Sequence, residues 1–144
     1  MSKKTIALAS DHAGIDLKDA IVTRLTEWGY TPLDLGPNTK DSVDYPDFAE
    51  KMADCLLNNQ AELGILICGT GIGISIAANR HRHIRAGLCQ SATEAKLTRA
   101  HNNANVLALG ARIIGEEIAF DCVKAFLETE YEGGRHERRV AKMS

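Results

Sequence analysis

The chain has 144 residues, of which 44% are hydrophobic and 25% are charged, and its formal net charge is −2. These values are typical of one globular domain with a substantial core, and they exclude a largely disordered chain. The small net charge gives no support for binding to nucleic acid or to an acidic membrane, and no apolar run is long enough to span a bilayer. The first residues, Met-Ser-Lys-Lys, lack the apolar core of a signal peptide, so we expect a cytoplasmic protein.

Five short apolar segments predict β-strands, and in chain order they are Thr5–Ser10, Thr31–Leu35, Leu63–Cys68, Ile84–Cys89 and Val106–Leu109. Most of them are apolar throughout, which is typical of strands covered on both faces. Segments with helical spacing lie between them. This alternation indicates βαβ units, and right-handed crossovers then predict a doubly wound parallel sheet with helices on both faces.

Local signals place several of the helices. Apolar residues from Ile15 to Trp28 recur at helical spacing, and Gly29 is suited to ending that helix. Pro46 marks the start of a second helix, and a later one is predicted over Ile113–Leu127. No repeat, low-complexity segment or linker interrupts the pattern, so we expect a single domain.

The third predicted strand ends at Cys68, and a turn with three alternating glycines, Gly69, Gly71 and Gly73, leads into a helix-like segment. The first N–H groups of a helix lack internal partners and lie at the positive end of its dipole, so this turn is suited to binding an anion, with the Thr70 hydroxyl as a further donor. A thiol at such a position ionises readily. A thiolate beside an anion hole favours chemistry that develops negative charge, although a single cysteine is ordinarily a small buried hydrophobe.

The cysteine and glycine patterns also exclude several common sites. The other cysteines, Cys55, Cys89 and Cys122, form no C-x-x-C pair and no zinc-ligand spacing with Cys68, so we expect four reduced thiols. The glycine turn has no Lys for a phosphate-binding P-loop. Its third glycine comes too early for a dinucleotide fingerprint, and no acidic residue follows the next strand.

Sites in open α/β sheets form at the carboxyl ends of the strands, so we expect three further segments to share one edge with Cys68. They are Ser10–Gly14, Arg99–Asn105 and Gly110–Arg112. Asp11 suits either a helix cap or a group that orients a substrate's ring oxygen and hydroxyls, next to an exposed His12. His101 is either an exposed histidine at a helix end or a functional one.

The tail is polar, and a helix is predicted from Arg135 onward. Arg135 and Arg139 are spaced i, i+4 and would share a helix face, which is either a solvated basic surface or a pair suited to a phosphate dianion. The preceding Tyr131-Glu132-Gly133-Gly134 is a hinge that could fold this arm, residues 131–144, over a site.

Taken together, the motifs closely resemble the ribose-5-phosphate isomerase B group of the ribose/galactose isomerase family. The resemblance spans nearly the whole chain, and the motifs that carry it are Ser10–Gly14, Asp44-Tyr45-Pro46, Cys68-Gly-Thr-Gly-Ile-Gly-Ile-Ser75, His101-Asn-Asn-Ala-Asn105 and Tyr131-Glu-Gly-Gly-Arg-His136. It implies a Rossmann-like three-layer α/β/α sandwich with a five-stranded parallel sheet. It also implies a metal-free interconversion of ribose 5-phosphate and ribulose 5-phosphate in the pentose phosphate pathway, without a cofactor.

The resemblance further implies roles for individual residues. Cys68 would be the base that moves a proton between C1 and C2, and His101 would assist ring opening. The glycine turn, which is Gly69, Thr70, Gly71, Ile72 and Gly73, would hold the enediolate oxygens. The remaining substrate and phosphate contacts would come from Asp11, His12, Asn102, Arg112, Arg135 and Arg139. Family members are dimers in which each site is completed by the neighbouring subunit, and pairing of dimers into tetramers stays open.

One branch of the family replaces the cysteine base with a glutamate in the glycine loop. The matching position here is Ile74, which cannot take a proton, so the cysteine branch fits better. Three other functions stay open at this stage. They are isomerisation of allose 6-phosphate or another six-carbon sugar phosphate, a non-catalytic module that binds a sugar phosphate or nucleotide beside an inert Cys68, and a thiol hydrolase with a Cys68–His101 pair.

Overall fold

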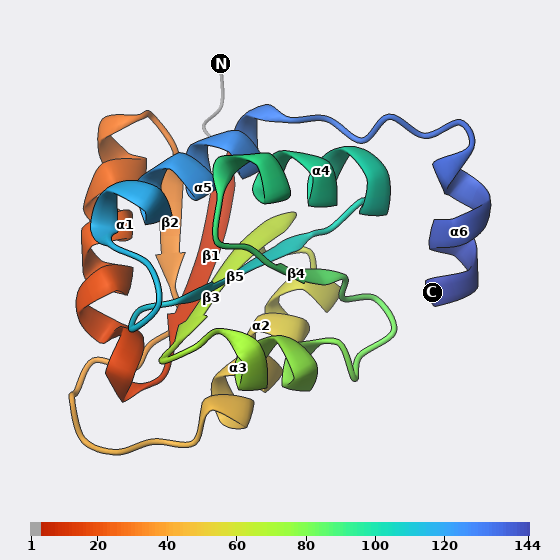
Figure 1. Cartoon of the computed structure of the whole chain (residues 1–144). Helices are drawn as coiled ribbons and strands as arrows, with labels where there is room; N and C mark the ends of the chain where they lie inside the picture. Colours follow the sequence, from red (N-terminus) through yellow and green to blue (C-terminus); the bar gives the residue numbers. More distant parts are fainter. Residues whose placement is uncertain (1–3) are drawn as a thin grey trace.

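The computed structural model describes residues 4–144 and contains one five-stranded sheet. All five predicted strands are confirmed as β1 (Thr5–Ser10), β2 (Thr31–Asp34), β3 (Leu63–Cys68), β4 (Ala86–Leu88) and β5 (Val106–Gly110). Every pairing is parallel and the order is β2-β1-β3-β5-β4 (Figure 1). β4 is shorter than predicted, because only Ala86 to Leu88 pair with β5.

Helices follow the strands. They are α1 (Ile15–Glu27), α2 (Tyr45–Leu57), α3 (Ile72–Ala78), α4 (Ala92–Asn102), α5 (Glu116–Glu128) and α6 (His136–Met143), with a 3-10 turn η1 (His12–Gly14) before α1. Gly29 has a φ of 90° directly after α1, so the predicted helix stop is confirmed. The helix predicted to start at Ile113 begins at Glu116. The N–H groups of Ile113 and Ile114 both bond to the Gly110 carbonyl, which makes a turn there.

Two apolar cores lie on opposite faces of the sheet, which gives the three-layer sandwich of a Rossmann-like fold. One core packs α1, α4 and α5 against the sheet through residues such as Ile21, Ala95 and Phe126. The other packs α2 and α3 through residues such as Met52 and Ile74. The central strand β3 is buried at every position because both of its faces are covered. Within residues 4–144, no helix is both long and apolar enough to cross a membrane.

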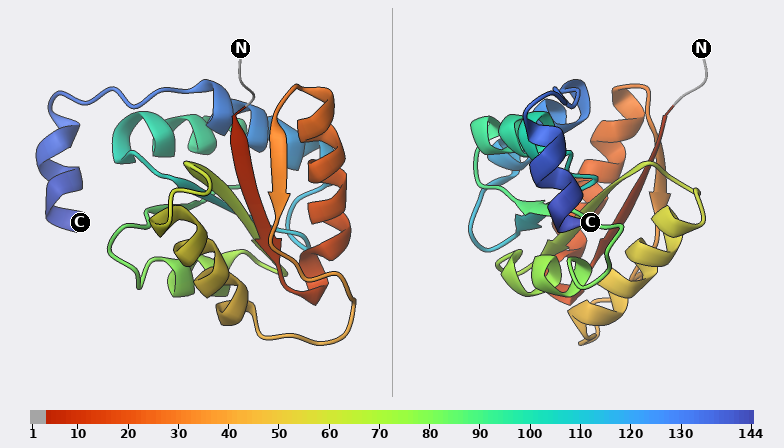
Figure 2. Two further views of the ribbon diagram at one scale, coloured as in Figure 1. Left: turned by 180° about the vertical axis from the view of Figure 1, so that it is seen from behind. Right: turned by 90° about the vertical axis from the view of Figure 1, so that its right-hand side faces the viewer.

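The last segment leaves this sandwich. After α5 the chain passes the end of α4 and turns into α6, which stands at one side of the molecule in Figure 1 and faces the viewer in the right-hand view of Figure 2. A backbone hydrogen bond from Glu132 N–H to the Ala100 carbonyl, 3.0 Å long, attaches the segment to α4. Gly133 and Gly134 then adopt φ values of 68° and 58°, which glycine tolerates, and these values reverse the chain into α6. The helix begins at His136, one residue later than predicted.

Candidate active site

Cys68 lies at the carboxyl end of β3, where the chain enters the glycine turn. Its side chain is 4% exposed and packs in the core formed with α2 and α3. The Gly71 N–H donates a hydrogen bond to the sulfur at 3.1 Å. This contact holds the sulfur against the backbone of the glycine turn.

The glycine turn is held in a conformation that other residues resist. Gly71 has a φ of 79°, and a Cβ built there would lie 2.6 Å from Leu88 Cδ1 and 2.8 Å from the Leu109 carbonyl carbon. The Thr70 hydroxyl accepts a hydrogen bond from Ile72 N–H at 3.1 Å, which fixes the turn from within. The same geometry directs the N–H of Gly71, the N-cap of α3, at the sulfur.

Replacing Gly71 with alanine is therefore expected to destabilise the protein by about 2–4 kcal/mol, since the left-handed backbone and the clash with Leu109 add. Chemical denaturation measures the loss. Gly115→Ala is the matched control, because a Cβ at Gly115 meets no atom within 4 Å and the backbone there has an ordinary φ of −80°. Equal stability of the two variants would contradict the assigned turn geometry.

Arg112 adds a positive charge to this edge. It follows β5, whose Gly110 pairs with Cys68, and its backbone N–H bonds to the Gly69 carbonyl at 2.9 Å. A Cβ built on Gly69 would lie 3.4 Å from Arg112 Nη1, so the guanidinium packs directly over the turn. The predicted neighbourhood of Cys68 and Arg112 is confirmed.

Asp11 and His12 lie at the end of β1 on the same edge. The Asp11 carboxylate accepts hydrogen bonds from Ala13 N–H at 3.0 Å and Gly14 N–H at 3.1 Å, so it is a helix cap, as one of the two predicted roles requires. His12 Nδ1 accepts from Val43 N–H at 3.1 Å, which requires a neutral ring with its proton on Nε2. Both residues line a hollow of about 460 Å³ with Tyr45 and its neighbours.

The prediction that residues 99–105 share the edge of Cys68 is wrong. His101 lies in the last turn of α4, which leads into the amino end of β5. In the register of the sheet, Val106 at that end pairs with Gly64, whereas Cys68 pairs with Gly110. These two ends of β5 are about 13 Å apart along the strand, so the structure separates His101 from the thiol of its own chain.

The amide-rich run after His101 is mostly structural. Asn103 ends α4 in the left-handed conformation, with a φ of 48°. The Asn105 side chain accepts from Arg85 N–H and donates to the His83 carbonyl, both at 2.8 Å, so it ties the start of β4 to β5. Asn102 alone is exposed, and it lines a separate hollow of about 380 Å³ beside Met143.

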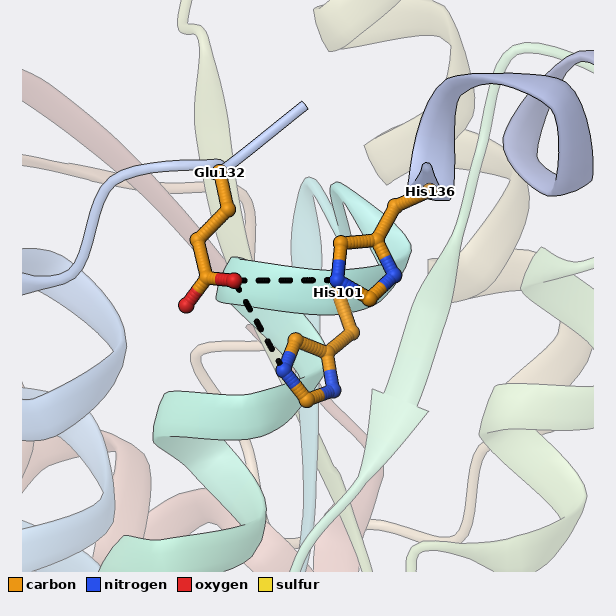
Figure 3. A group of neighbouring side chains, drawn as sticks. All are labelled: His101, Glu132 and His136. Atoms are coloured by element: carbon orange, nitrogen blue, oxygen red, sulfur yellow. Dashed lines mark ion pairs between the residues drawn. The ribbon is translucent and has the colours of Figure 1, made fainter. Parts of the chain in front are cut away.

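His101 belongs instead to a second cluster, formed with the C-terminal arm (Figure 3). Its ring stacks on that of His136, with centroids 4.4 Å apart and planes inclined by 16°. The Glu132 carboxylate lies 3.9 Å from His101 Nε2 and 3.6 Å from His136 Nε2. Burial, and then the charges of His101 and Arg135, lower the pKa of His136 below its usual range.

The arm therefore does not fold over the Cys68 edge of its own chain. Arg135 and Arg139 lie on the arm with the second cluster, at the other edge of the molecule. Neither Glu132 nor His136 was assigned a role from the sequence. The signal that could have suggested them is their place on either side of the Gly133-Gly134 turn, with His136 directly after Arg135.

The other cysteines behave as predicted. Cys55, Cys89 and Cys122 are buried and unpaired by disulfides. Burial raises the pKa of the Cys89 thiol to about 12 and that of Cys122 to about 11, and it also raises the pKa of Cys55. These thiols are inert at neutral pH, which sets Cys68 apart as the one that touches a backbone donor at a strand end.

Comparisons with known proteins agree with this geometry. A family model described as Ribose/Galactose Isomerase matches residues 6–143. Ribose-5-phosphate isomerase B of Escherichia coli is 47% identical over 137 residues, which are 95% of this chain and 92% of that protein. A ribose 5-phosphate isomerase from Thermotoga maritima has a TM-score of 0.96 at 51% identity, covering 99% of this chain and 98% of that one. The Mycoplasma genitalium ribose-5-phosphate isomerase B, solved with bound ribulose-5-phosphate, has a TM-score of 0.93 at 43% identity, covering 99% and 95%.

Proposed function

The chain belongs to the ribose/galactose isomerase family, and from this we infer that it interconverts ribose 5-phosphate and ribulose 5-phosphate with Cys68 as the base. The observation that carries the assignment of the base is the Gly71 N–H, 3.1 Å from the sulfur, at a strand end beside Arg112. The related enzymes act on or bind these sugar phosphates. We also place the protein in the cytoplasm, where its four thiols stay reduced.

The isomerisation step needs a base and a site for negative charge. Removing the proton next to the carbonyl leaves an enediolate, whose charge lies on the oxygens of C1 and C2. Donors that are already oriented toward such an oxygen can each contribute about 3–4 kcal/mol to the transition state. Within the turn, the Gly71 N–H already bonds to Cys68 Sγ and the Ile72 N–H to the Thr70 hydroxyl. The neighbouring N–H groups of Thr70 and Gly73 are therefore suited to this task, and Cys68 returns the proton to the neighbouring carbon.

Ring opening must come first, because ribose 5-phosphate is mostly a closed furanose. We assign this step to His101, since an imidazole exchanges protons near neutral pH. His101 lies at the opposite edge from Cys68 of its own chain, so the two meet only when a second copy supplies His101. We therefore propose a homodimer in which each site combines Cys68, Asp11, His12 and Arg112 of one copy with residues of the other.

We propose that the phosphate-binding residues of one site also come from both copies of the dimer. Arg135 and Arg139 lie on the arm that carries His136, which stacks on His101, and Asn102 is exposed in a hollow that Met143 of the arm also lines. The guanidinium fork suits a phosphate dianion, and His12 offers an Nε2–H donor from the other half of the site. The phosphate takes no part in bond making, so its binding energy serves to hold C1 and C2 at the thiolate.

The direct test is conversion of ribose 5-phosphate to ribulose 5-phosphate in the presence of a chelator, run beside allose 6-phosphate. Turnover of the pentose phosphate supports the proposal. Turnover of allose 6-phosphate alone would mean that the substrate is a hexose phosphate and not a pentose phosphate. Turnover of neither would favour a non-catalytic binding module. In that last case Cys68 should also react with thiol reagents no faster than an ordinary free cysteine.

Replacing His101 with asparagine separates ring opening from proton transfer. Ribulose 5-phosphate carries its phosphate on O5 and stays open-chain, so its enolisation needs no ring opening. We expect kcat on ribose 5-phosphate to fall about 100-fold, while solvent deuterium still enters C1 of ribulose 5-phosphate at close to the wild-type rate. NMR in D2O measures the exchange. Equal losses in both assays would exclude a ring-opening role.

A further inference from the structure

The His101–Glu132–His136 cluster has a geometry that the proposed reaction does not yet use. His136 is 7% exposed, and its Nε2 has no hydrogen-bond partner among residues 4–144. A buried polar atom without a partner costs free energy, so it indicates a site built for something other than stability. That nitrogen faces the Glu132 carboxylate, which is exposed and also faces His101 (Figure 3).

The position of Glu132 relative to His101 is determined by the backbone. Glu132 N–H bonds to the carbonyl of Ala100, the residue before His101, at 3.0 Å. Directly after Glu132, the Gly133-Gly134 turn reverses the chain, and His136 N–H bonds to the Gly133 carbonyl at 3.1 Å. The arm therefore brings one carboxylate and one flat ring to His101 through a short stretch of chain.

The stacking of the His101 and His136 rings indicates whether this cluster is suited to binding a metal ion or to holding a proton. The three ligand atoms lie within 4.8 Å of one another, which is close enough for one ion. However, an imidazole nitrogen binds a metal in the plane of its ring, and two rings inclined by only 16° and stacked at 4.4 Å cannot direct both lone pairs at one point. Electrostatic attraction between each ring and one carboxylate at 3.6–3.9 Å does not need that in-plane alignment, so the arrangement favours proton chemistry.

We propose that Glu132 is a positioning residue for ring opening: its carboxylate, 3.9 Å from His101 Nε2, keeps a proton on that nitrogen, and the stacked His136 ring holds the imidazole in place. Nδ1 of His101 points away from Glu132 and is left for the substrate (Figure 3). The distance exceeds a hydrogen bond, but such contacts in ligand-free sites are often long and shorten when substrate binds. The proposal rests on the assignment of His101 to ring opening.

The step that Glu132 supports balances without any further reagent. The C1–O4 bond breaks and the C1=O1 bond forms, while the anomeric hydroxyl loses a proton and O4 gains one. His101 accepts or supplies a proton at Nδ1. The negative charge of Glu132 stabilises the His101 ring while both of its nitrogens carry a proton. Arg135 and Arg139 oppose a positive charge on the His136 ring, whereas the Glu132 carboxylate favours one, so this carboxylate has a clear electrostatic role in the cluster.

The test is Glu132→Gln, which keeps the shape and removes the charge. We expect kcat on ribose 5-phosphate to fall about tenfold with KM changed less than twofold, because a group acting through His101 contributes less than His101 itself. Deuterium entry into ribulose 5-phosphate should stay at the wild-type rate. Glu132→Asp should recover most of the lost kcat, and Glu130→Gln, which removes an exposed charge from the same segment, should behave as wild type.

Three results would overturn the proposal. They are an unchanged kcat in Glu132→Gln, equal losses of conversion and of deuterium exchange in that variant, and wild-type activity that falls on dialysis against a chelator. The last result would show that the cluster holds a metal. A failure of the proposed function is distinguishable, because it would appear as persistent deuterium exchange in a Cys68→Ala variant, whatever Glu132→Gln does.

Discussion

Replacing Cys68 with alanine is expected to lower kcat/KM for ribose 5-phosphate by roughly a thousandfold or more, which is within the range for losing a general base. The alanine has no group that can take the C1 or C2 proton, and Cys68 is the cysteine whose sulfur accepts a hydrogen bond from the glycine turn. The variant should still fold, because losing one buried sulfur costs only about 1–2 kcal/mol. A coupled assay of ribulose 5-phosphate and thermal unfolding measure the two effects.

Cys55→Ala is the matched control for this variant. Cys55 is 3% exposed and Cys68 4%, and both belong to the core beneath α2 and α3. Both variants should therefore lose similar stability, while Cys55→Ala keeps wild-type turnover. Cys68→Ala should also stop deuterium entry into ribulose 5-phosphate. Wild-type turnover in Cys68→Ala would eliminate the thiol as the base and transfer that role to another group on this edge.

The layers of the fold were predictable because apolar patterning determines them. A strand buried on both faces, such as Leu63–Cys68, must be apolar throughout, and the chain contains few other runs of that kind. The same reasoning located Cys68, Asp11 and Arg112 correctly, since each follows the carboxyl end of a parallel strand. The start of the last long helix was misplaced because Ile113 and Ile114 are apolar but lie in a turn.

The error over His101 has a topological reason that the sequence already contained. Residues that precede a parallel strand lie at its amino end, so His101, just before Val106, could not share the edge of Cys68. The contact between His101 and His136 was not predictable, because the whole of β5 and α5 separates them, and only the Gly133-Gly134 turn brings their rings together.

Because Cys68 and His101 of one chain are far apart, we expect two inactive variants to restore activity when they are mixed. In a dimer with twofold symmetry, a site that combines Cys68 of one copy with His101 of the other is restored when Cys68→Ala and His101→Asn chains pair. One site of each mixed dimer then carries both native residues, and its other site carries neither. Random exchange makes about half of the dimers mixed, so we expect about a quarter of wild-type activity.

The experiment mixes the two purified variants after dissociation and reassociation, and it measures kcat on ribose 5-phosphate against the mixing ratio. A mixture that stays as inactive as its parents, although mass spectrometry shows mixed dimers, would mean that each chain builds its site alone. The register of β3 against β5 argues against that outcome, because it holds the two residues at opposite ends of β5. Glu132→Gln combined with His101→Asn in one chain should complement Cys68→Ala equally well, since both changes then fall in the site that is already inactive.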